Sequence, residues 1–352
     1  MEVKNIALDI PNGPIIPLGN YMLDMVGATD GVGDSIYVYD AGEVVRELWK
    51  DIISGGRKIN VRSVFPKELG LEPTHFYAIM KGKRGIAIQS LNRLHHLWKF
   101  YCDKSDDEVK IRWDAIHERG FPLASFSKPE KFFLPKAITP KISYIMGYLV
   151  GDGCFDSSKK HYRVKISETN KNQLEYVLKP LLVETLGAEP IIKNEGSGRL
   201  NSNFILINSK PIFRFLRNIL GIKVGEIPAL VKKMDATNKS FFLRGVFDSE
   251  GCADASYLGS KIRVFQASKE FLDEVIELFS DIGITTNGPY GPFFKYPSEK
   301  FKYQSKWYAI EIRKKSEILK FIDKVGSSHV GKIPKLQFLS GEIRSRYKYP
   351  SS

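Results

Sequence analysis

The sequence predicts an α+β protein in which a mainly helical amino-terminal domain precedes two pseudo-symmetric αββαββα modules, whose antiparallel sheets form a saddle. One observation behind this prediction is a short pattern that occurs twice, from Gly147 to Cys154 (GYLVGDGC) and from Gly245 to Cys252 (GVFDSEGC). Each copy closes an apolar stretch with an acid, and these acids, Asp152 and Glu250, are 98 residues apart. The other observation is that similar predicted elements follow each copy. A repeat of this length is typical of one supersecondary unit used twice.

The length of 352 residues allows two or three domains, each with its own core. We expect an amino-terminal domain at residues 1–130, a first module at 131–235 and a second module at 236–352. The segment from Ser125 to Pro140 contains three prolines and is interpreted as a linker.

The amino-terminal domain is predicted to contain a helix-turn-helix. Helices are expected at 42–53 and 88–101, and between them residues 64–84 have the spacing of two short helices that meet at Gly70. The predicted inward side chains are Leu69, Phe76 and Ile79, and the predicted DNA-binding side chains on the exposed face are Thr74, His75, Tyr77 and Lys81. A plain helical bundle fits this segment nearly as well. The acidic stretch 103–108 is interpreted as a loop.

In the first module, hydrophobic periodicity and glycine positions define each element. The predicted elements are a helix at 142–151, a strand at 162–167, a helix at 170–186, strands at 190–193 and 204–207 joined by the polar turn 195–198, and a helix at 210–220. The glycines Gly187 and Gly221 follow the two later helices, as helix ends require.

The second module repeats this order. Its predicted elements are a helix at 241–249, a strand at 262–267, a helix at 269–282, strands at 285–290 and 307–313, and a helix at 315–325. The tails also correspond, because Val224 to Pro228 (VGEIP) matches Val330 to Pro334 (VGKIP). Alternating polar and apolar residues in the strands predict antiparallel sheets with one face on helices and one face free.

The net charge of +13 lies entirely in the repeated part of the chain. Residues 1–135 hold 18 basic and 18 acidic residues, which leaves 35 of the 53 basic and 22 of the 40 acidic residues for 136–352. A basic region favours a polyanionic partner, because lysine and arginine that neutralise phosphates release counterions. A solvated lysine-rich surface explains the charge alone equally well. The coincidence of charge and repeat favours nucleic acid.

Other features of the sequence argue against a membrane protein and a disulfide-rich one. No apolar run approaches the roughly 20 residues of a membrane span, and no signal peptide is visible at the start. The three cysteines have no metal-ligand spacing. We therefore expect a cytoplasmic, nucleoid-associated prokaryotic or archaeal protein, in which Cys154 and Cys252 are packed thiols.

The repeated pattern resembles the LAGLIDADG homing endonucleases, in the two-motif single-chain form that also occurs inside inteins. The residues that carry the resemblance are Leu243 to Gly251 (LRGVFDSEG), the looser copy Ile145 to Gly153 (IMGYLVGDG), and the two Ile-Pro tails. It covers roughly residues 140–340. Since the chain begins at Met1 and lacks the terminal residues of a splicing element, we expect the freestanding form, encoded in an intron or between genes.

The resemblance implies a monomeric endonuclease that binds double-stranded DNA and cuts both strands with Mg²⁺, for which Mn²⁺ can substitute. Small residues four apart let the two motif helices approach closely, so Asp152 and Glu250 are expected side by side as catalytic residues and metal ligands. Gly151 and Ser249, which precede them, are expected beside the metal. Asp248 is interpreted as a structural residue, because it points to another side of the helix.

The family places a basic residue from each module near the metal. Lys332 corresponds to the lysine of the family's second tail and is expected to be catalytic. Glu226 stands at the matching position of the first tail, where a lysine is expected, and Lys223 is the candidate substitute. This difference predicts unequal cleavage of the two strands.

The family lays the free sheet faces along the major groove, where long polar side chains reach phosphates and base edges. The residues that we expect to bind DNA there are Arg163, Lys165, Glu168, Lys193, Arg199, Lys261, Arg263, Gln266, Lys306 and Arg313.

Two alternatives remain open from the sequence. A protein of the same fold could bind nucleic acid without cutting it, either as an intron-splicing RNA maturase with intron RNA as partner or as a transcriptional regulator. A glycosidase with two carboxylates fits poorly, because sugar clefts do not need an excess of lysine and arginine.

Overall fold

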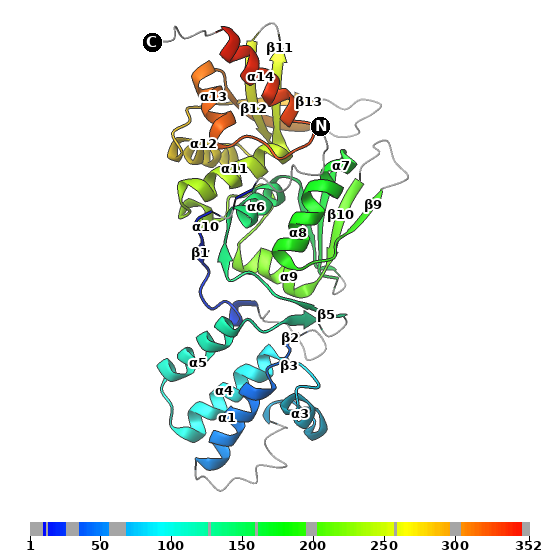
Figure 1. Ribbon diagram of the computed structural model, residues 1–352, viewed down its shortest axis with the longest axis vertical. Coiled ribbons are helices and arrows are strands. Elements are labelled where there is room, and N and C mark those ends of the chain that lie inside the picture. The colour runs from blue at the N-terminus through cyan, green and yellow to red at the C-terminus, as the bar shows by residue number, and fades with distance from the viewer. Residues whose placement is uncertain are drawn as a thin grey trace.

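The computed structural model describes residues 10–11, 13–25, 35–55, 68–125, 128–158, 161–194, 203–256, 259–295 and 304–346. The molecule is elongated, with the amino-terminal helices at the bottom of Figure 1, the first module in the middle and the second module at the top. Among the described residues no helix has the length and apolar character of a membrane span.

The amino-terminal part combines helices with a small sheet, so the expectation of a mainly helical domain is incomplete. Its helices are α1 (Gly42–Ser54), α3 (Pro73–Met80), α4 (Ile88–Cys102) and α5 (Asp106–Arg119). Its antiparallel sheet has the order β3-β2-β4-β5, from β3 (Ile86–Ala87), β2 (Ile36–Val38), β4 (Leu123–Ser125) and β5 (Lys128–Phe132). Strands of two or three residues carry too little periodic signal to be found in a sequence.

Two further expectations for this part are wrong. The acidic stretch 103–108 is a helix start, because Ser105 caps α5 and forms a reciprocal capping box with Glu108. Acids in the first turn are favourable beside the positive end of a helix dipole. The proline-containing segment 125–140 is also not a plain linker, since it holds β5 and β6 (Ala137–Ile138), and β6 pairs with β1 (Ile16–Pro17).

The helix-turn-helix prediction is tested only in its second half. Residues 64–67 lie outside the described part of the chain. In α3 the side chains of Phe76 and Ile79 are buried, as expected. The predicted recognition face is also exposed, with Thr74, His75, Tyr77 and Lys81 open to solvent.

The first module contains every element expected of it. These are α6 (Pro140–Asp152), β7 (Gly153–Asp156), β8 (Arg163–Glu168), a helix of three joined segments from Lys171 to Leu186 (α7, a π-helical turn and α8), β9 (Ile191–Asn194), β10 (Asn203–Asn208), and α9 (Lys210–Arg214) continued by a π-helical turn to Ile219. The predicted turn 195–198 lies outside the described residues. β7, which directly follows the motif, is the strand that the sequence did not locate.

The second module has the same elements in the same order. They are α11 (Ala236–Glu250), β11 (Gly251–Ser256), β12 (Gly259–Gln266), α12 (Lys269–Asp281), β13 (Asn287–Lys295), β14 (Ser305–Ile312) and α13 (Lys315–Lys324), followed by α14 (Ile333–Arg346). The two sheets have equivalent antiparallel orders, β7-β8-β10-β9 and β11-β12-β14-β13. The predicted α+β fold with antiparallel sheets is therefore confirmed, and α14 is an addition that the sequence did not indicate.

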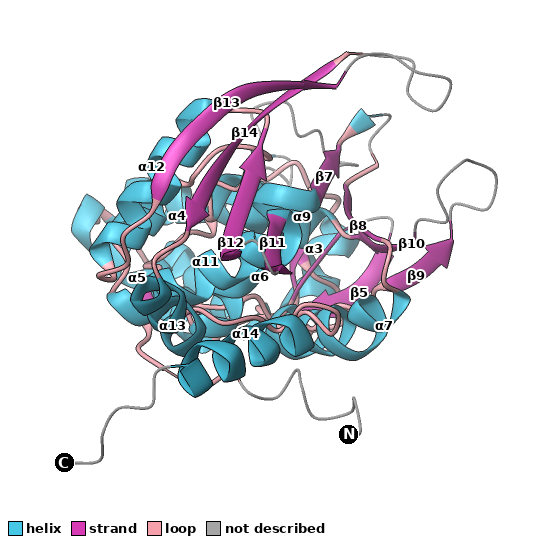
Figure 2. Cartoon of the chain, turned by 90° about the horizontal axis from the view of Figure 1, so that it is seen from above, coloured by secondary structure: helices cyan, strands magenta, loops and turns pink. Residues whose placement is uncertain are grey.

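The motif helices α6 and α11 form the centre of the repeated part, with one sheet to each side (Figure 2). Their backbones touch at two glycines. A Cβ atom at Gly147 would lie 1.9 Å from the carbonyl oxygen of Phe242, and one at Gly245 would lie 2.2 Å from that of Tyr144. Only glycine fits at either position, and the close approach brings the carboxyl ends of the two helices together.

Candidate functional site

The two motif acids are the last residues of the two packed helices, Asp152 in α6 and Glu250 in α11. A glycine follows each acid and begins a strand. A Cβ atom at Gly153 would lie 2.2 Å from the carbonyl oxygen of Leu149, and one at Gly251 would lie 2.1 Å from the ring of Phe247. Each glycine therefore lets the chain pass directly from helix to strand and fixes the acid at that junction.

Both carboxyl groups are harder to ionise than an isolated acid. Burial, and then the negative charge of Glu168, raise the pKa of Asp152 to about 6. Burial, and then the charge of Asp152, raise the pKa of Glu250 to about 7. Two neighbouring carboxylates in a partly desolvated position repel each other, and a cation between them removes this penalty.

Lys332 lies beside the acids, as expected for the lysine of the second tail. Its ammonium group donates to the carbonyl oxygens of Phe247 at 2.8 Å and Asp248 at 2.7 Å. Burial lowers its pKa, and its charge lowers the pKa of both Asp152 and Glu250. The lysine is held by backbone atoms of the motif helix, so its position follows that of the acids.

The first tail is built differently. Lys223 forms an exposed ion pair with Glu226 at 3.0 Å. The amide of Gly225 donates to the carbonyl oxygen of Val150 at 2.7 Å, so the tail does reach the first motif helix. Lys223 is absent from the residues that line the cavity beside Asp152, and the structure does not bring it to the position that Lys332 occupies.

The expectation that Glu168 lies on the free sheet face is wrong. Side chains alternate along β8, so Arg163 and Lys165 share one face while Glu168 belongs to the other. Its carboxylate accepts hydrogen bonds from the Tyr148 hydroxyl at 2.6 Å, from the Asn170 amide at 2.8 Å and from His329 Nε2 at 3.2 Å. Burial would raise the pKa of Glu168, but these hydrogen bonds outweigh it and lower the pKa to about 2.

The expectation that Gln266 lies on the free sheet face is wrong for the same reason. It belongs to the helix-facing side of β12, and its amide donates to Glu250 Oε1 at 3.2 Å. Gln266 stands 98 residues after Glu168, as Glu250 does after Asp152, and both strands keep this register because Gly153 pairs with Ile166 and Gly251 pairs with Val264. Strand parity together with the 98-residue offset could have located both residues from the sequence.

Asp248 is fully buried and structural, as expected. It accepts hydrogen bonds from the Tyr144 hydroxyl at 2.9 Å, from the Ser328 amide at 2.8 Å and from the Ser327 hydroxyl. These contacts join both motif helices to the loop that carries His329. The role of His329 in this network was not indicated by the sequence.

A cavity of about 410 Å³ lies beside Asp152, Glu168 and Lys332. The residues that line it are Asp152, Ser167, Glu168, Thr169, Asp248, Ser249, His329 and Lys332. The described residues contain no cluster of three or more histidine, cysteine or acidic side chains with metal-ligand geometry. The donor set is nonetheless all oxygen, from Asp152, Glu250 and the nearby backbone, which suits a hard divalent cation that takes its remaining ligands from water or phosphate.

The two residues predicted to flank the metal lie in the helix contact. A Cβ atom at Gly151 would lie 2.1 Å from Ser249 Oγ. The Ser249 hydroxyl donates to the carbonyl oxygens of Gly245 and Val246 within its own helix, at 3.2 and 3.1 Å. Gly151 can therefore offer a metal only its backbone carbonyl group, whereas Ser249 also lines the cavity beside Asp152.

The free faces of the two sheets carry most of the other predicted DNA-binding residues. Arg163 and Lys165 lie on the first sheet, and Lys261 and Arg263 on the second. Arg263 pairs with Asp254, while Lys261 and Arg313 both pair with the buried Glu311. Cys154 is exposed, so the prediction that it packs is wrong. Of the remaining candidates, Lys193 is exposed and Arg199 lies outside the described residues. Lys306 is also exposed, but it pairs with Phe294 on the opposite face of its sheet, so the expectation that it lies on the free face is wrong.

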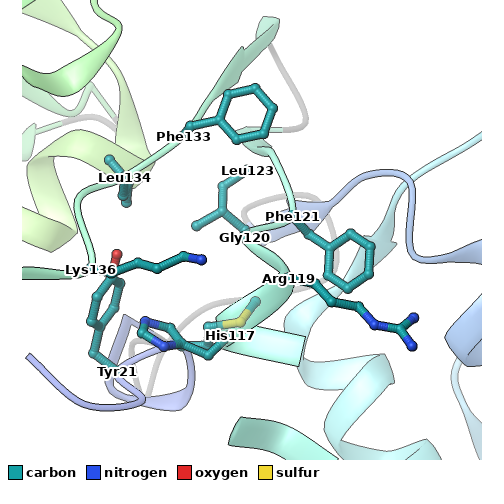
Figure 3. Close-up of a pocket in the computed structure, with 10 residues that line it drawn as sticks. Tyr21, His117, Arg119, Gly120, Phe121, Leu123, Phe133, Leu134 and Lys136 are labelled. Atoms are coloured by element: carbon teal, nitrogen blue, oxygen red, sulfur yellow. The ribbon is translucent and has the colours of Figure 1, made fainter. Parts of the chain in front are cut away.

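A second cavity, of about 310 Å³, lies where α5 meets the segments around Tyr21 and Lys136 (Figure 3). The ring of Tyr21 packs against those of His117 and Phe215, which connects the amino-terminal part to the first module. Lys136 donates to the carbonyl oxygen of Glu118 at the end of α5. This cavity contains no carboxylate pair and lies apart from the motif acids.

Comparison with known proteins identifies the class of the repeated fold. Residues 238–326 match the model of the LAGLIDADG-like domain. This match contains the second motif copy and confirms the resemblance seen there; the first copy lies outside the matched residues.

Two curated relatives come from Methanocaldococcus jannaschii. One is named glutamine–fructose-6-phosphate aminotransferase and is 32% identical over 164 residues, which are 45% of this chain and 14% of the relative. The other is an uncharacterised protein that is 27% identical over 213 residues, 59% of this chain and 74% of the relative. The chain thus spans only a small part of the first relative and about three quarters of the second.

Solved structures with a similar arrangement include I-DmoI in complex with DNA and manganese, at 16% identity and a TM-score of 0.38, covering 54% of this chain and 98% of that one. The amino-terminal LAGLIDADG domain of WhiA has 16% identity and a TM-score of 0.36, covering 53% of this chain and 82% of that one.

Proposed function

We propose that the protein is a site-specific DNA endonuclease that makes a metal-dependent double-strand break in a long target. The observation that carries the proposal is the carboxylate pair Asp152 and Glu250, held side by side at the ends of two helices that only glycine allows to touch. Because the two carboxylates repel each other and are both partly buried, a bound cation would stabilise them. The basic charge of the modules supplies the attraction for DNA.

In this proposal Asp152 and Glu250 bind the metal, Mg²⁺ or Mn²⁺. A divalent cation at such a site lowers the pKa of a bound water and stabilises the oxygen that leaves the phosphate. The residues of the chain position the phosphate between the two sheets. Lys332, anchored on the carbonyl groups of Phe247 and Asp248, presents a positive charge where negative charge develops.

The proposed test is the selection of cleaved sites from a random DNA library in the presence of Mg²⁺. We expect one long sequence to be enriched and to be cut in both strands. Asp152→Asn and Glu250→Gln should still bind the selected duplex and should lower its cleavage rate by at least about a hundredfold, as is usual when a catalytic metal ligand is lost. Cleavage at the wild-type rate by both variants would refute the mechanism.

A second candidate is a nucleic-acid-binding protein without cleavage, either a transcriptional regulator or an intron-splicing maturase. It is favoured by the inequality of the two tails, in which Lys332 is buried beside the acids while Glu226 pairs with Lys223 at the surface. Tight, salt-sensitive binding with no nicking at any Mg²⁺ or Mn²⁺ concentration would support a regulator if the ligand is duplex DNA. It would support a maturase if the ligand is structured RNA.

A further inference from the structure

The edge strand β13 contains a three-residue repeat, Gly-Pro-Tyr at 288–290 and Gly-Pro-Phe at 291–293. Along its partner β14 the register is Asn287 with Glu311, Tyr290 with Ala309, and Phe293 with Trp307. β13 therefore advances three residues for every two on β14, which is one bulge for each repeat. A spacing of three would normally put successive side chains on opposite faces. Each bulge absorbs one residue, so Asn287, Tyr290 and Phe293 form a row on one face.

The two glycines of the repeat are required by the backbone. Their φ angles are 117° at Gly288 and 123° at Gly291, where other residues are strained. A Cβ atom would also lie 2.8 Å from the carbonyl oxygen of Ala309 at Gly288, and 2.9 Å from that of Trp307 at Gly291. β13 is the edge strand of its sheet, and its two prolines have no amide donor, which disfavours pairing with a further strand. The glycines and prolines of the repeat thus fix the backbone that holds Asn287, Tyr290 and Phe293 in a row.

The row lies on the free face of the second sheet. The β14 partners of Tyr290 and Asn287 are Ala309 and Glu311, which pair on their other side with Phe265 and Arg263 of β12. Phe265 and Arg263 point away from the helices, so the row lies on the same face as they do. Tyr290 is 40% exposed and Phe293 is 43% exposed. The ring of Phe293 lies 6.1 Å from that of Trp307, and the Arg313 guanidinium lies 5.7 Å from the ring of Tyr290. The result is an apolar strip with the guanidinium of Arg313 beside it.

We propose that this row reads thymine methyl groups, and an adjoining adenine, in the major groove of the half-site beneath the second module. The inference rests on the proposed binding of DNA. Thymine presents the apolar C5 methyl group in that groove, and a side-chain amide such as that of Asn287 pairs with adenine there. Arg313 beside the row and the basic charge of the modules complement the phosphates.

The spacing of the row matches the spacing of base pairs. Successive members pair with residues two apart on β14, so they are about 7 Å apart along the strand. This distance is two steps of about 3.4 Å along a DNA strand. We therefore expect contacts at every second base pair, with Tyr290 and Phe293 over thymines two steps apart. An RNA duplex has no such methyl group, and its narrow major groove does not admit side chains.

The test uses the full chain in buffer without divalent metal, where DNA is bound and not cut. Duplexes bound from a random library are sequenced, and single thymines of the enriched site are then replaced by uracil, which lacks the methyl group. We expect two positions, two steps apart in one half-site, at which uracil raises the Kd about fourfold, as the exposure of one buried methyl implies. In Tyr290→Ala and Phe293→Ala each variant should lose the sensitivity at one of these positions.

A matched control is Phe294→Ala. Phe294 is a neighbouring aromatic residue that is 47% exposed, and it pairs with Lys306 on the opposite face of the sheet. This variant should keep both uracil-sensitive positions. The uracil measurement on the wild-type protein needs no variant, so it stands even where a substitution disturbs folding.

The outcomes separate this inference from the proposed function. Absence of any duplex binding at low salt would overturn both. An enriched site at which uracil changes nothing, or at which Tyr290→Ala and Phe293→Ala keep full sensitivity, would overturn the reading of thymine and leave the proposed function standing. Equal affinity for an RNA duplex of the same sequence would also overturn it.

Discussion

At the scale of residues, the candidate site is defined by carboxyl groups that differ in their surroundings. Glu168 is held ionised by hydrogen bonds from Tyr148, Asn170 and His329. Asp152 and Glu250 have raised pKa values of about 6 and about 7, because they are partly buried near other negative charges. The Glu168 carboxylate holds the loop of His329 in place through their hydrogen bond. The protonation of Asp152 and Glu250 depends instead on the positive charge near them.

The raised pKa values predict how the stability of the metal-free protein depends on pH. Since each folded pKa lies above its unfolded value, these acids favour the folded state only at low pH, and this contribution is lost as the pH rises through about 6 and 7. Glu250→Gln should therefore be more stable than the wild type at pH 8, by about 1–2 kcal/mol. Denaturant unfolding at pH 8 and pH 5 without metal checks this, and an equal difference at both pH values would contradict it.

Lys332→Met tests the electrostatic role of the buried lysine. Because its charge lowers the pKa of both Asp152 and Glu250, its removal should move the rising limb of the cleavage rate to higher pH and lower the rate at pH 7 by about tenfold or more. The same substitution at Lys223, whose ammonium pairs with Glu226, should leave the limb where it is. A pH profile that is unchanged in Lys332→Met would exclude this role.

At the scale of elements, the contact of α6 with α11 positions the site. Its two glycines allow the helix backbones to touch, and the glycine after each acid turns the chain into β7 or β11. The polar network of Asp248 then ties both helices to the loop before α14. Mutation of the helix contact should therefore affect the fold and the site together.

Gly147→Ala should destabilise the protein by about 3 kcal/mol or more, because the added methyl group would lie 1.9 Å from a backbone oxygen of α11 that cannot move alone. Gly341→Ala, in the exposed part of α14 where nothing lies within 4 Å, should instead stabilise by about 0.5–1 kcal/mol. Urea unfolding of the three proteins measures both effects. A loss below about 1 kcal/mol in Gly147→Ala would mean that the helices separate easily.

At the scale of the whole molecule, two similar modules form one site whose halves are chemically unequal. The Asp152 half has Glu168, and the Glu250 half has Gln266 at the equivalent position. The second tail contributes His329 and Lys332, whereas the first tail has an exposed ion pair at the corresponding place. These differences add to the one between Glu226 and Lys332, from which the sequence alone predicted unequal cleavage.

This inequality predicts ordered cutting of the two DNA strands. On supercoiled plasmid with one selected site, a nicked circle should accumulate before the linear product, with the two cleavage steps differing by about tenfold or more in rate. Denaturing gels with each strand labelled would identify the strand that is cut first. Linear product without a nicked intermediate, at limiting enzyme, would show that the halves act equally.

The sequence by itself determined the repeat, the order of most helices and strands in both modules, and the two acids, because these depend on local periodicity and on spacing along the chain. It did not locate the short strands of the amino-terminal part, the faces of Glu168 and Gln266, or the place of His329. Those depend on strand register and on contacts between segments up to 161 residues apart. The tertiary structure decided them, because only packing specifies which buried polar groups share a hydrogen bond.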